Sequence, residues 1–583
     1  MSSSPLTQFA YRTPNEIGLY YGCPSFRPVD TFEKVTGAVR SVRYSKNGLY
    51  VAWALPEGVK IMNAESGKVL AEIARSNVVE IEFSPKGTYI STWERPSKAE
   101  DGSAVHNLII WEVATGNKLA DFSQKLQNNW NVQWTDDESY CARMVTNEVH
   151  FFDPKSIAKG PHSKLRLENI SAFSLSPGRS PSVATFVPEK KGAPAMVRVY
   201  SITNFSGPLC QKTFFKSDKV QILWNQLGTD LLILTQTEVD KTGKSYYGET
   251  NLYFISVPRQ YDARVTLDKE GPIHDVAWSP TSKEFVVVYG YMPAKATLFD
   301  HRANPIHDFG AAPRNYIRFS PHGRLICLAG FGNLAGTIDV WDRKDFKKIS
   351  TIEASGTTTC EWSPDGRYLL TATLSPRLRV DNGFKVWHHS GKLVAAENFA
   401  ELYEVVWRPA SVDLFPIRTS LSPPPAAVLK NAPELTAAKP APKKMGAYRP
   451  PHARGTSTPT IFKREDEIAN SRGSTIPGAA ANDEAEKLSK SAMKNKKRRE
   501  ARKENENNTL AKSSAADAVS SNQPAGGVSE TDKKIRNINK KLQQIQDLKT
   551  RQANGEKLEL TQIQKIQNEA KLLEELQQLK LDS

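Results

Sequence analysis

The chain has few cysteines, and none is placed for a disulfide framework or a zinc site. Five cysteines occur among 583 residues, at positions 23, 141, 210, 327 and 360, without a Cys-x-x-Cys pair. Structural zinc sites need cysteines and histidines at short fixed spacings, and disulfide-rich secreted domains need many cysteines in a short chain. The sequence therefore predicts a protein of a reducing compartment, with no bound metal and no structural disulfide.

Long apolar runs are also missing. No stretch approaches the roughly 18 consecutive apolar residues that a membrane-spanning helix needs, and no secretory signal opens the chain. Both observations predict a soluble, intracellular protein that has no membrane partner.

The motifs of common enzyme classes are absent as well. Gly243-Lys244-Ser245 resembles the end of a phosphate-binding loop, but the glycine required five positions earlier is Glu238. The glycine-rich stretch 330–336 lacks the spacing of a dinucleotide-binding turn, which favours a tight loop between strands. Neither His-Glu-x-x-His nor Gly-x-Ser-x-Gly occurs. We therefore expect no enzyme, no cofactor and no small-molecule substrate, although catalytic residues gathered from distant repeats would leave no such motif.

The sequence does contain a repeat. Nine times in the first 417 residues, an aromatic or apolar residue precedes Ser, Thr or Asn (Arg in the ninth copy) and a turn residue, often with Pro between them. The copies begin at Tyr44, Phe83, Trp134, Leu175, Trp224, Trp278, Phe319, Trp362 and Trp407. Repeats of about 40 to 50 residues made of short strands are typical of β-propeller blades. We predict an all-β fold, a WD40-like β-propeller with nine blades; seven or eight blades are the alternatives.

The ends of the repeat region predict how the ring closes. The ninth repeat is short, because the composition changes soon after Trp407. Strand-like segments at 9–11 and 18–21 precede the first repeat. We expect the N-terminus to supply the outer strands of the last blade, since closure removes exposed sheet edges. Residues 1–417 would then form one domain.

Positive charge is concentrated after the repeats. Residues 418–583 contain 31 Lys and Arg against 20 Asp and Glu, whereas residues 1–417 contain 47 against 43. Attraction to a polyanion is therefore expected mainly from the tail.

The tail begins with a predicted linker. Residues 418–482 are rich in Pro, Ala and Ser with few large apolar residues, a composition that favours disorder. Within it, Tyr448 and Arg449 belong to an Ala-Tyr-Arg-Pro-Pro segment that is either a short docking motif or neutral linker.

A basic helix is predicted at 483–505. This segment has no Pro or Gly, and nine basic residues lie between 487 and 503 with one acidic residue. They are Lys487, Lys490, Lys494, Lys496, Lys497, Arg498, Arg499, Arg502 and Lys503. Phosphates would relieve the repulsion among these side chains, and each neutralised phosphate releases counterions. We favour RNA contact; a solvated charge run and a nuclear import signal are the alternatives.

Two further helices are predicted after a second linker at 506–530. In 531–581 apolar residues recur every three or four positions on either side of an Asn-Gly pair. The first helix carries Ile535, Ile538, Leu542 and Ile545. We expect either an antiparallel coiled-coil-like hairpin or two helices that dock on a partner.

Several propeller loops are too distinctive for a generic repeat. They are residues 239–249, 288–297, 328–334 and 375–383. With the Ala447–Pro451 segment and the basic helix, they resemble the eukaryotic translation initiation factor 2A family along essentially the whole chain. The propeller is also similar, more faintly, to that of the b component of eukaryotic initiation factor 3.

The resemblance implies a cytoplasmic factor that binds the small ribosomal subunit (its rRNA and proteins) and mRNA, alongside other initiation factors. It also implies delivery of methionyl initiator tRNA to the start codon without guanine nucleotide, including at non-AUG codons. On the propeller, Lys295, Arg377 and Arg379 lie in the distinctive loops and are further candidates for RNA contact; salt-bridged loop residues are the alternative for all three. A scaffold that assembles a ribosome-associated complex without binding tRNA is the rival function.

Overall fold

The computed structural model describes two parts of the chain. It describes residues 6–98, 102–190, 192–215, 217–237, 248–417 and 419–425, and seven helical residues between 542 and 573. The chain divides into compact units at 1–448 and 449–583. All strands of the described residues lie in the first unit.

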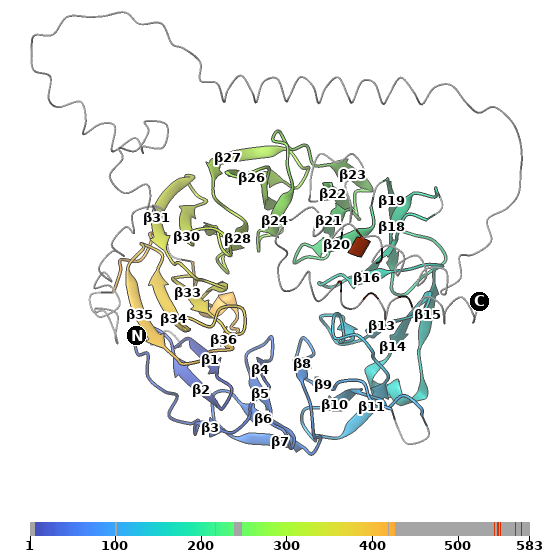
Figure 1. Cartoon of the computed structure of the whole chain (residues 1–583), viewed down its shortest axis with the longest axis horizontal. Helices are drawn as coiled ribbons and strands as arrows, with labels where there is room; N and C mark the ends of the chain where they lie inside the picture. The colour runs from blue at the N-terminus through green and yellow to red at the C-terminus, as the bar shows by residue number, and fades with distance from the viewer. Residues whose placement is uncertain are drawn as a thin grey trace, which may run out of the picture. The chain divides into compact units, whose positions relative to one another are not determined.

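The first unit is a nine-bladed β-propeller (Figure 1). Nine four-stranded antiparallel sheets follow one another around a ring, and the first strand of each blade lies nearest its centre. This confirms the predicted fold class and the number of blades.

Strands at the same position in each blade share a role and are grouped accordingly. The first strands are β4 (Ser41–Tyr44), β8 (Glu80–Phe83), β12 (Gln133–Trp134), β16 (Ala172–Leu175), β20 (Lys219–Trp224), β24 (Ile273–Trp278), β28 (Tyr316–Phe319), β32 (Thr359–Trp362) and β36 (Glu404–Trp407). The second strands are β5 (Tyr50–Ala54), β9 (Tyr89–Trp93), β13 (Cys141–Val145), β17 (Ser182–Val187), β21 (Asp230–Gln236), β25 (Glu284–Tyr289), β29 (Leu325–Ala329), β33 (Tyr368–Thr373) and β1 (Gln8–Arg12). The third strands are β6 (Val59–Asn63), β10 (Leu108–Glu112), β14 (Glu148–Phe152), β18 (Ala195–Ser201), β22 (Thr250–Ser256), β26 (Ala294–Asp300), β30 (Thr337–Asp342), β34 (Gly383–His388) and β2 (Glu16–Tyr21). The fourth strands are β7 (Val69–Ile73), β11 (Lys118–Phe122), β15 (Ser163–Arg166), β19 (Cys210–Phe214), β23 (Tyr261–Arg264), β27 (Pro305–Ala312), β31 (Lys347–Glu353), β35 (Leu393–Asn398) and β3 (Val35–Thr36). The described residues of the first unit also form two 3-10 helices, η1 (Pro154–Lys159) and η2 (Val412–Leu414).

The repeated sequence phrase forms the turn between the first and second strands. In blade 7 the Ser320 hydroxyl accepts a hydrogen bond of 3.0 Å from the backbone N–H of Leu325, which begins β29. In six other repeats the equivalent bond is accepted by the side chain of Ser45, Ser84, Thr135, Ser176, Asn225 or Ser363. These seven side chains are at most 2% exposed, so their oxygen atoms satisfy buried backbone donors. In these seven repeats a short polar side chain at this position therefore stabilises the turn.

The hydrophobic core is divided among the junctions between blades. Nine clusters of buried apolar residues are present, one at each junction. The cluster between blades 7 and 8, for example, joins Cys327 and Val340 to Cys360 and Leu369. Each blade buries both of its faces only when both neighbours are present, as is typical of repeat folds.

The two ends of the propeller sequence meet in the ninth blade. Strand β1 pairs antiparallel with β36, with Phe9 opposite Trp407 and Arg12 opposite Glu404. The order of this sheet is β3-β2-β1-β36, so the N-terminal residues supply three of its four strands. This is the closure that the short ninth repeat predicts.

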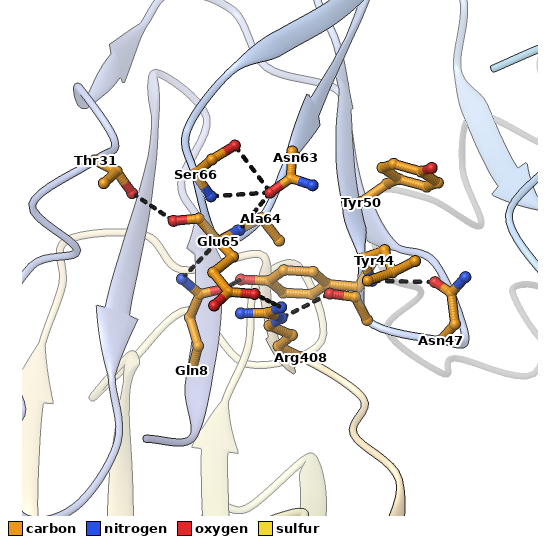
Figure 2. Close-up of polar contacts among 12 residues, drawn as sticks. Gln8, Thr31, Tyr44, Asn47, Tyr50, Asn63, Ala64, Glu65, Ser66 and Arg408 are labelled. Atoms are coloured by element: carbon orange, nitrogen blue, oxygen red, sulfur yellow. Dashed lines mark hydrogen bonds and ion pairs between the residues drawn. The ribbon is translucent and has the colours of Figure 1, made fainter. Parts of the chain in front are cut away.

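Polar contacts hold the ninth blade to the first (Figure 2). The Gln8 side chain, 2% exposed, donates to the Ala64 carbonyl at 3.2 Å and accepts from the Tyr44 hydroxyl at 3.2 Å. Arg408 donates from Nε to the Gly48 carbonyl at 2.6 Å. The ninth repeat, which has Arg in place of Ser, thus uses this residue to reach the turn of the first blade.

We expect Gln8→Met to lower the free energy of unfolding by about 1–3 kcal/mol, because Ala64 and Tyr44 would lose buried hydrogen bonds at similar side-chain volume. Urea unfolding followed by tryptophan fluorescence measures the change. Thr31→Val is the matched control, because it also removes a hydrogen bond between blades 9 and 1, but an exposed one. The Thr31 hydroxyl donates to the Glu65 carbonyl at 3.3 Å. An equal loss in both variants would contradict a special role for Gln8.

Candidate nucleic-acid interface

The four distinctive loops lie on one face of four consecutive blades. Each overlaps the connection between the second and third strands, in blades 5, 6, 7 and 8 respectively. Because blades are related by rotation around the ring, equivalent connections emerge on the same face. We call this the loop face. The part of the blade 5 loop from 238 to 247, with Gly243-Lys244-Ser245, is outside the described residues.

The blade 8 loop, between β33 and β34, has a firmly built base. Asn382 is 2% exposed; its side chain donates to the Leu378 carbonyl at 2.7 Å and accepts from the Leu402 N–H at 3.2 Å. The Ser375 N–H donates to the Leu402 carbonyl at 2.7 Å, and the Thr358 hydroxyl accepts from the Leu374 N–H at 3.0 Å. These bonds fix both ends of the loop to neighbouring strands and connections.

The tip of this loop presents both positive and apolar side chains to solvent. Residues 376 to 380 are all exposed, including Arg377 and Arg379. Leu378 is 40% exposed and Val380 is 73% exposed. Within the described residues, neither arginine has an ion-pair partner. A pair of free guanidinium groups beside exposed apolar groups is suited to phosphate or protein contact.

Arg377 also reaches across to blade 7. A Cβ atom placed on Gly332 would lie 3.3 Å from one Arg377 nitrogen, and the φ of Gly332 is +75°. Glycine therefore suits this position in both conformation and space. Gly332, Thr357 and Arg377 border a cavity of about 230 Å³ between the two loops. The glycine-rich stretch 330–336 is thus an inter-strand loop, as predicted.

Lys295 has a different environment from the two arginines. It lies in β26, and its ammonium group contacts Asp268 and lies 2.9 Å from Asp308. Its side chain is 19% exposed, and the hydrogen bonds that it donates, foremost the one to Asp268, raise its pKa. The salt-bridged alternative fits Lys295, because its charge is already balanced by two carboxylates. The arginines, by contrast, are available at the surface.

The centre of the ring is unfavourable for phosphate. On the first strands, Arg43 of blade 1 contacts Glu404 of blade 9 and lies 3.7 Å from Glu82 of blade 2. Burial raises the pKa of Glu82, and likewise that of Glu361 and Asp275 on other first strands. The arginines here already have carboxylate partners, so we expect nucleic-acid contact on the loop face and not along the axis.

Most of the predicted tail residues lie outside the described part of the chain. This applies to the nine basic residues between 487 and 503, and to Tyr448, Arg449, Ile535 and Ile538. Leu542 and Ile545 are described and helical, and Ile545 is 4% exposed. Lys549 forms an ion pair with Glu569, on the other side of the Asn-Gly pair. Whether these helices bind a partner stays a prediction.

Comparison with known proteins gives consistent matches. A family model described as Eukaryotic translation initiation factor eIF2A matches residues 212–405, and one described as Eukaryotic translation initiation factor 2A C-terminal domain matches residues 533–579. A relative from Schizosaccharomyces pombe, named eukaryotic translation initiation factor 2A, is 48% identical over 99% of both chains. A relative of the same name from Saccharomyces cerevisiae is 34% identical over 98% of this chain and 99% of its own.

A structural match agrees with these. A crystal structure of a eukaryotic initiation factor is 49% identical with a TM-score of 0.66, and covers 70% of this chain and 100% of that one. Among the described residues, no helix has the length and apolar character needed to span a bilayer.

The propeller and these matches define a translation initiation factor. The chain belongs to the eukaryotic translation initiation factor 2A family. The family indicates a role in protein synthesis.

Proposed function

We propose that this factor binds the small ribosomal subunit through the loop face of its propeller and carries methionyl initiator tRNA through its basic tail. It would act in the cytoplasm without guanine nucleotide, on mRNA with AUG or alternative start codons. Full-length similarity to family members named as initiation factors supports the general role. The observation that carries the ribosome contact is the tip of the blade 8 loop, with its two exposed arginines.

The tail would supply the second contact. We propose the arrangement predicted from sequence: linkers at 418–482 and 506–530, a basic helix at 483–505 and paired helices at 531–581. Two modest contacts joined in one chain reinforce each other, because the first raises the local concentration of the second. This division of labour explains why most net charge lies outside the propeller.

The loop-face contact is tested by the double variant Arg377→Gln/Arg379→Gln. If both arginines meet phosphates, we expect the affinity for purified small subunits to fall about tenfold near 0.15 M salt. The slope of log K against log salt concentration should become shallower by about 1.8. Sedimentation of the full-length factor with small subunits over a salt series measures both quantities. The thermal midpoint should not change, since both side chains are exposed.

Arg259→Gln/Arg302→Gln is the matched control for this variant. Both arginines are exposed, have no ion-pair partner among the described residues, and follow third strands on the opposite face. This variant therefore removes the same charge as Arg377→Gln/Arg379→Gln, but on the opposite face of the propeller. Equal losses in the two double variants would refute a specific loop-face contact.

A scaffold function is the second candidate, favoured by the exposed Leu378 and Val380. In that case Leu378→Ser/Val380→Ser should weaken ribosome binding more than the arginine variant, with little salt dependence. Initiator tRNA would then show no binding in a filter assay at low salt, which would exclude direct delivery.

A further inference from the structure

Residues 419–425, the start of the predicted linker, lie against the propeller. We call them the strap. Arg324 donates to the Thr419 carbonyl at 3.2 Å, and Lys392 donates to the Pro425 carbonyl at 2.8 Å. Leu421 packs against the core cluster of blades 7 and 8. The strap borders the turns between first and second strands and therefore lies on the face opposite the loop face.

Three basic side chains converge on one hydroxyl of the strap. Ser422 Oγ lies 3.1 Å from Arg367 Nε, 3.3 Å from His388 Nε2 and 3.3 Å from His389 Nε2. His388 Nδ1 lies 3.3 Å from the Ser390 N–H and accepts from it, so its Nε2 carries the proton and donates to Ser422. Arg367 also donates. The Ser422 hydroxyl therefore donates its own proton to His389 Nε2.

A cavity beside Ser422 is lined by residues with further nitrogen atoms that lack a hydrogen-bond partner among the described residues. Its volume is about 310 Å³, and it is lined by Arg324, Arg367 and both His322 and His389. The Nδ1 of His389 and the Nε2 of His322 are buried without a hydrogen-bond partner among the described residues. His389 itself is 3% exposed. These two nitrogen atoms border the cavity and are available to hydrogen-bond a group placed in it.

The carboxylates nearby are already bonded. Asp342 accepts from Arg324 at 3.0 Å, and Asp365 accepts from the Arg367 N–H at 3.2 Å and from the Ser363 hydroxyl. Arg367 has no ion-pair partner within the described residues. The pocket therefore favours an anion. It has room for a phosphate attached to the strap.

The sequence places a modifiable residue at this point. Ser422 is followed by Pro423, the pair that proline-directed protein kinases recognise. Six other Ser-Pro pairs have a serine that is at most 5% exposed: Ser84, Ser176, Ser279, Ser320, Ser363 and Ser375. Ser180, before Pro181, is exposed in a turn of blade 4. Ser422 differs from all of these because it lies in a peripheral segment and faces a basic pocket.

We propose that Ser422 is a phosphorylation site for a proline-directed kinase and that its phosphate, held by Arg367, His388 and His389, fixes the strap to blades 7 and 8. When the strap lifts into the kinase, Ser422 Oγ attacks the γ-phosphorus of ATP. The hydroxyl proton passes to the kinase base and ADP leaves. The phosphate brings about two negative charges and three acceptor oxygens to the pocket.

The histidines give this site a distinctive readout. Burial lowers the pKa of His388 to about 3 and that of His389 to about 4, so both are neutral at pH 7. An adjacent phosphate dianion favours the protonated ring and raises both pKa values. After phosphorylation, the two rings should titrate at a pH closer to the ordinary value of about 6.5.

Phosphoserine placed at position 422 of the full-length chain tests the proposal. We expect backbone amide exchange at Thr419 to Ser422 to slow by at least about tenfold, since charge-assisted hydrogen bonds are added. Histidine NMR signals should show the raised pKa values. Phosphoserine at position 180 is the control for added charge and should change neither readout.

Arg367→Gln separates the pocket from general effects of phosphorylation. In this variant, phosphorylation of Ser422 should slow amide exchange at Thr419 to Ser422 much less than it does in the wild-type sequence. The unphosphorylated Arg367→Gln variant gives the reference exchange rates. Unchanged or faster exchange in the phosphorylated wild-type sequence would overturn the proposal. A second experiment incubates the full-length protein with ATP and a cyclin-dependent-type kinase and locates phosphate by mass spectrometry. Phosphate on Ser180 but not on Ser422 would also overturn the proposal.

Discussion

Replacing seven basic residues of the predicted tail helix with glutamine is expected to weaken initiator tRNA binding by about 100- to 1,000-fold near 0.15 M salt. The seven are Lys494, Lys496, Lys497, Arg498, Arg499, Arg502 and Lys503. The reason is counterion release: each lost phosphate contact lowers the slope of log K against log salt by about 0.9. If about five of the seven meet phosphates, the slope falls by about four to five. Filter binding across a salt series measures affinity and slope together.

The control variant changes the same charge elsewhere in the tail. Lys439, Lys443, Lys444, Arg454, Lys463, Arg464 and Arg472 are also seven basic residues, but they are scattered through the Pro-rich segment. Glutamine at these positions should reduce affinity far less, because charges spread over 34 positions of the predicted linker are not expected to form one phosphate-binding surface. Equal effects in both variants would mean that net charge alone attracts the RNA, and that the segment 483–505 has no particular role.

The propeller could be predicted because its signals are local in sequence. The repeated phrase is a turn in which a Ser, Thr or Asn side chain bonds a backbone N–H a few positions later, as Ser363 does for Tyr368 at 3.0 Å. Such a bond depends on neighbours in the chain, so it leaves a pattern at each repeat. Ring closure was predictable for a related reason, because an incomplete ninth repeat leaves β36 without partners unless the N-terminus provides them.

The candidate site was less predictable, because the availability of a charge depends on residues far away in sequence. Lys295 and Arg377 both occur in distinctive loops, yet Lys295 contacts Asp268, 27 positions earlier, whereas Arg377 is exposed at the surface. The exposure of Leu378 and Val380 could not be predicted from the sequence, because apolar residues in loops are buried about as often as they are exposed. The strap likewise has the composition of a linker, because its contacts with Arg367 and His389 span 55 and 33 residues and leave no local pattern.

Removing residues 1–22 is expected to abolish cooperative folding of the propeller. The deletion takes away β1 and β2, which pair with β36 and β3 in the ninth blade. Phe9, fully buried between Phe384 and Trp407, is lost with them. Blades 8 and 1 would each expose one core face, and β36 would present a free edge. Because blades are stable only when both neighbours cover them, the loss should spread beyond the ninth blade.

Circular dichroism and calorimetry of the truncated chain measure this effect, with size-exclusion chromatography to detect aggregation. Deleting residues 1–5 is the control, since the pairing of β1 begins at Gln8 and should be untouched. A synthetic peptide of residues 1–22 added to the truncated chain should restore a sharp unfolding transition, because it can supply β1 and β2 in trans. A truncated chain that unfolds at the same temperature as the full-length protein would show that eight blades hold the ring without the ninth, contrary to the closure described by the β1–β36 pairing.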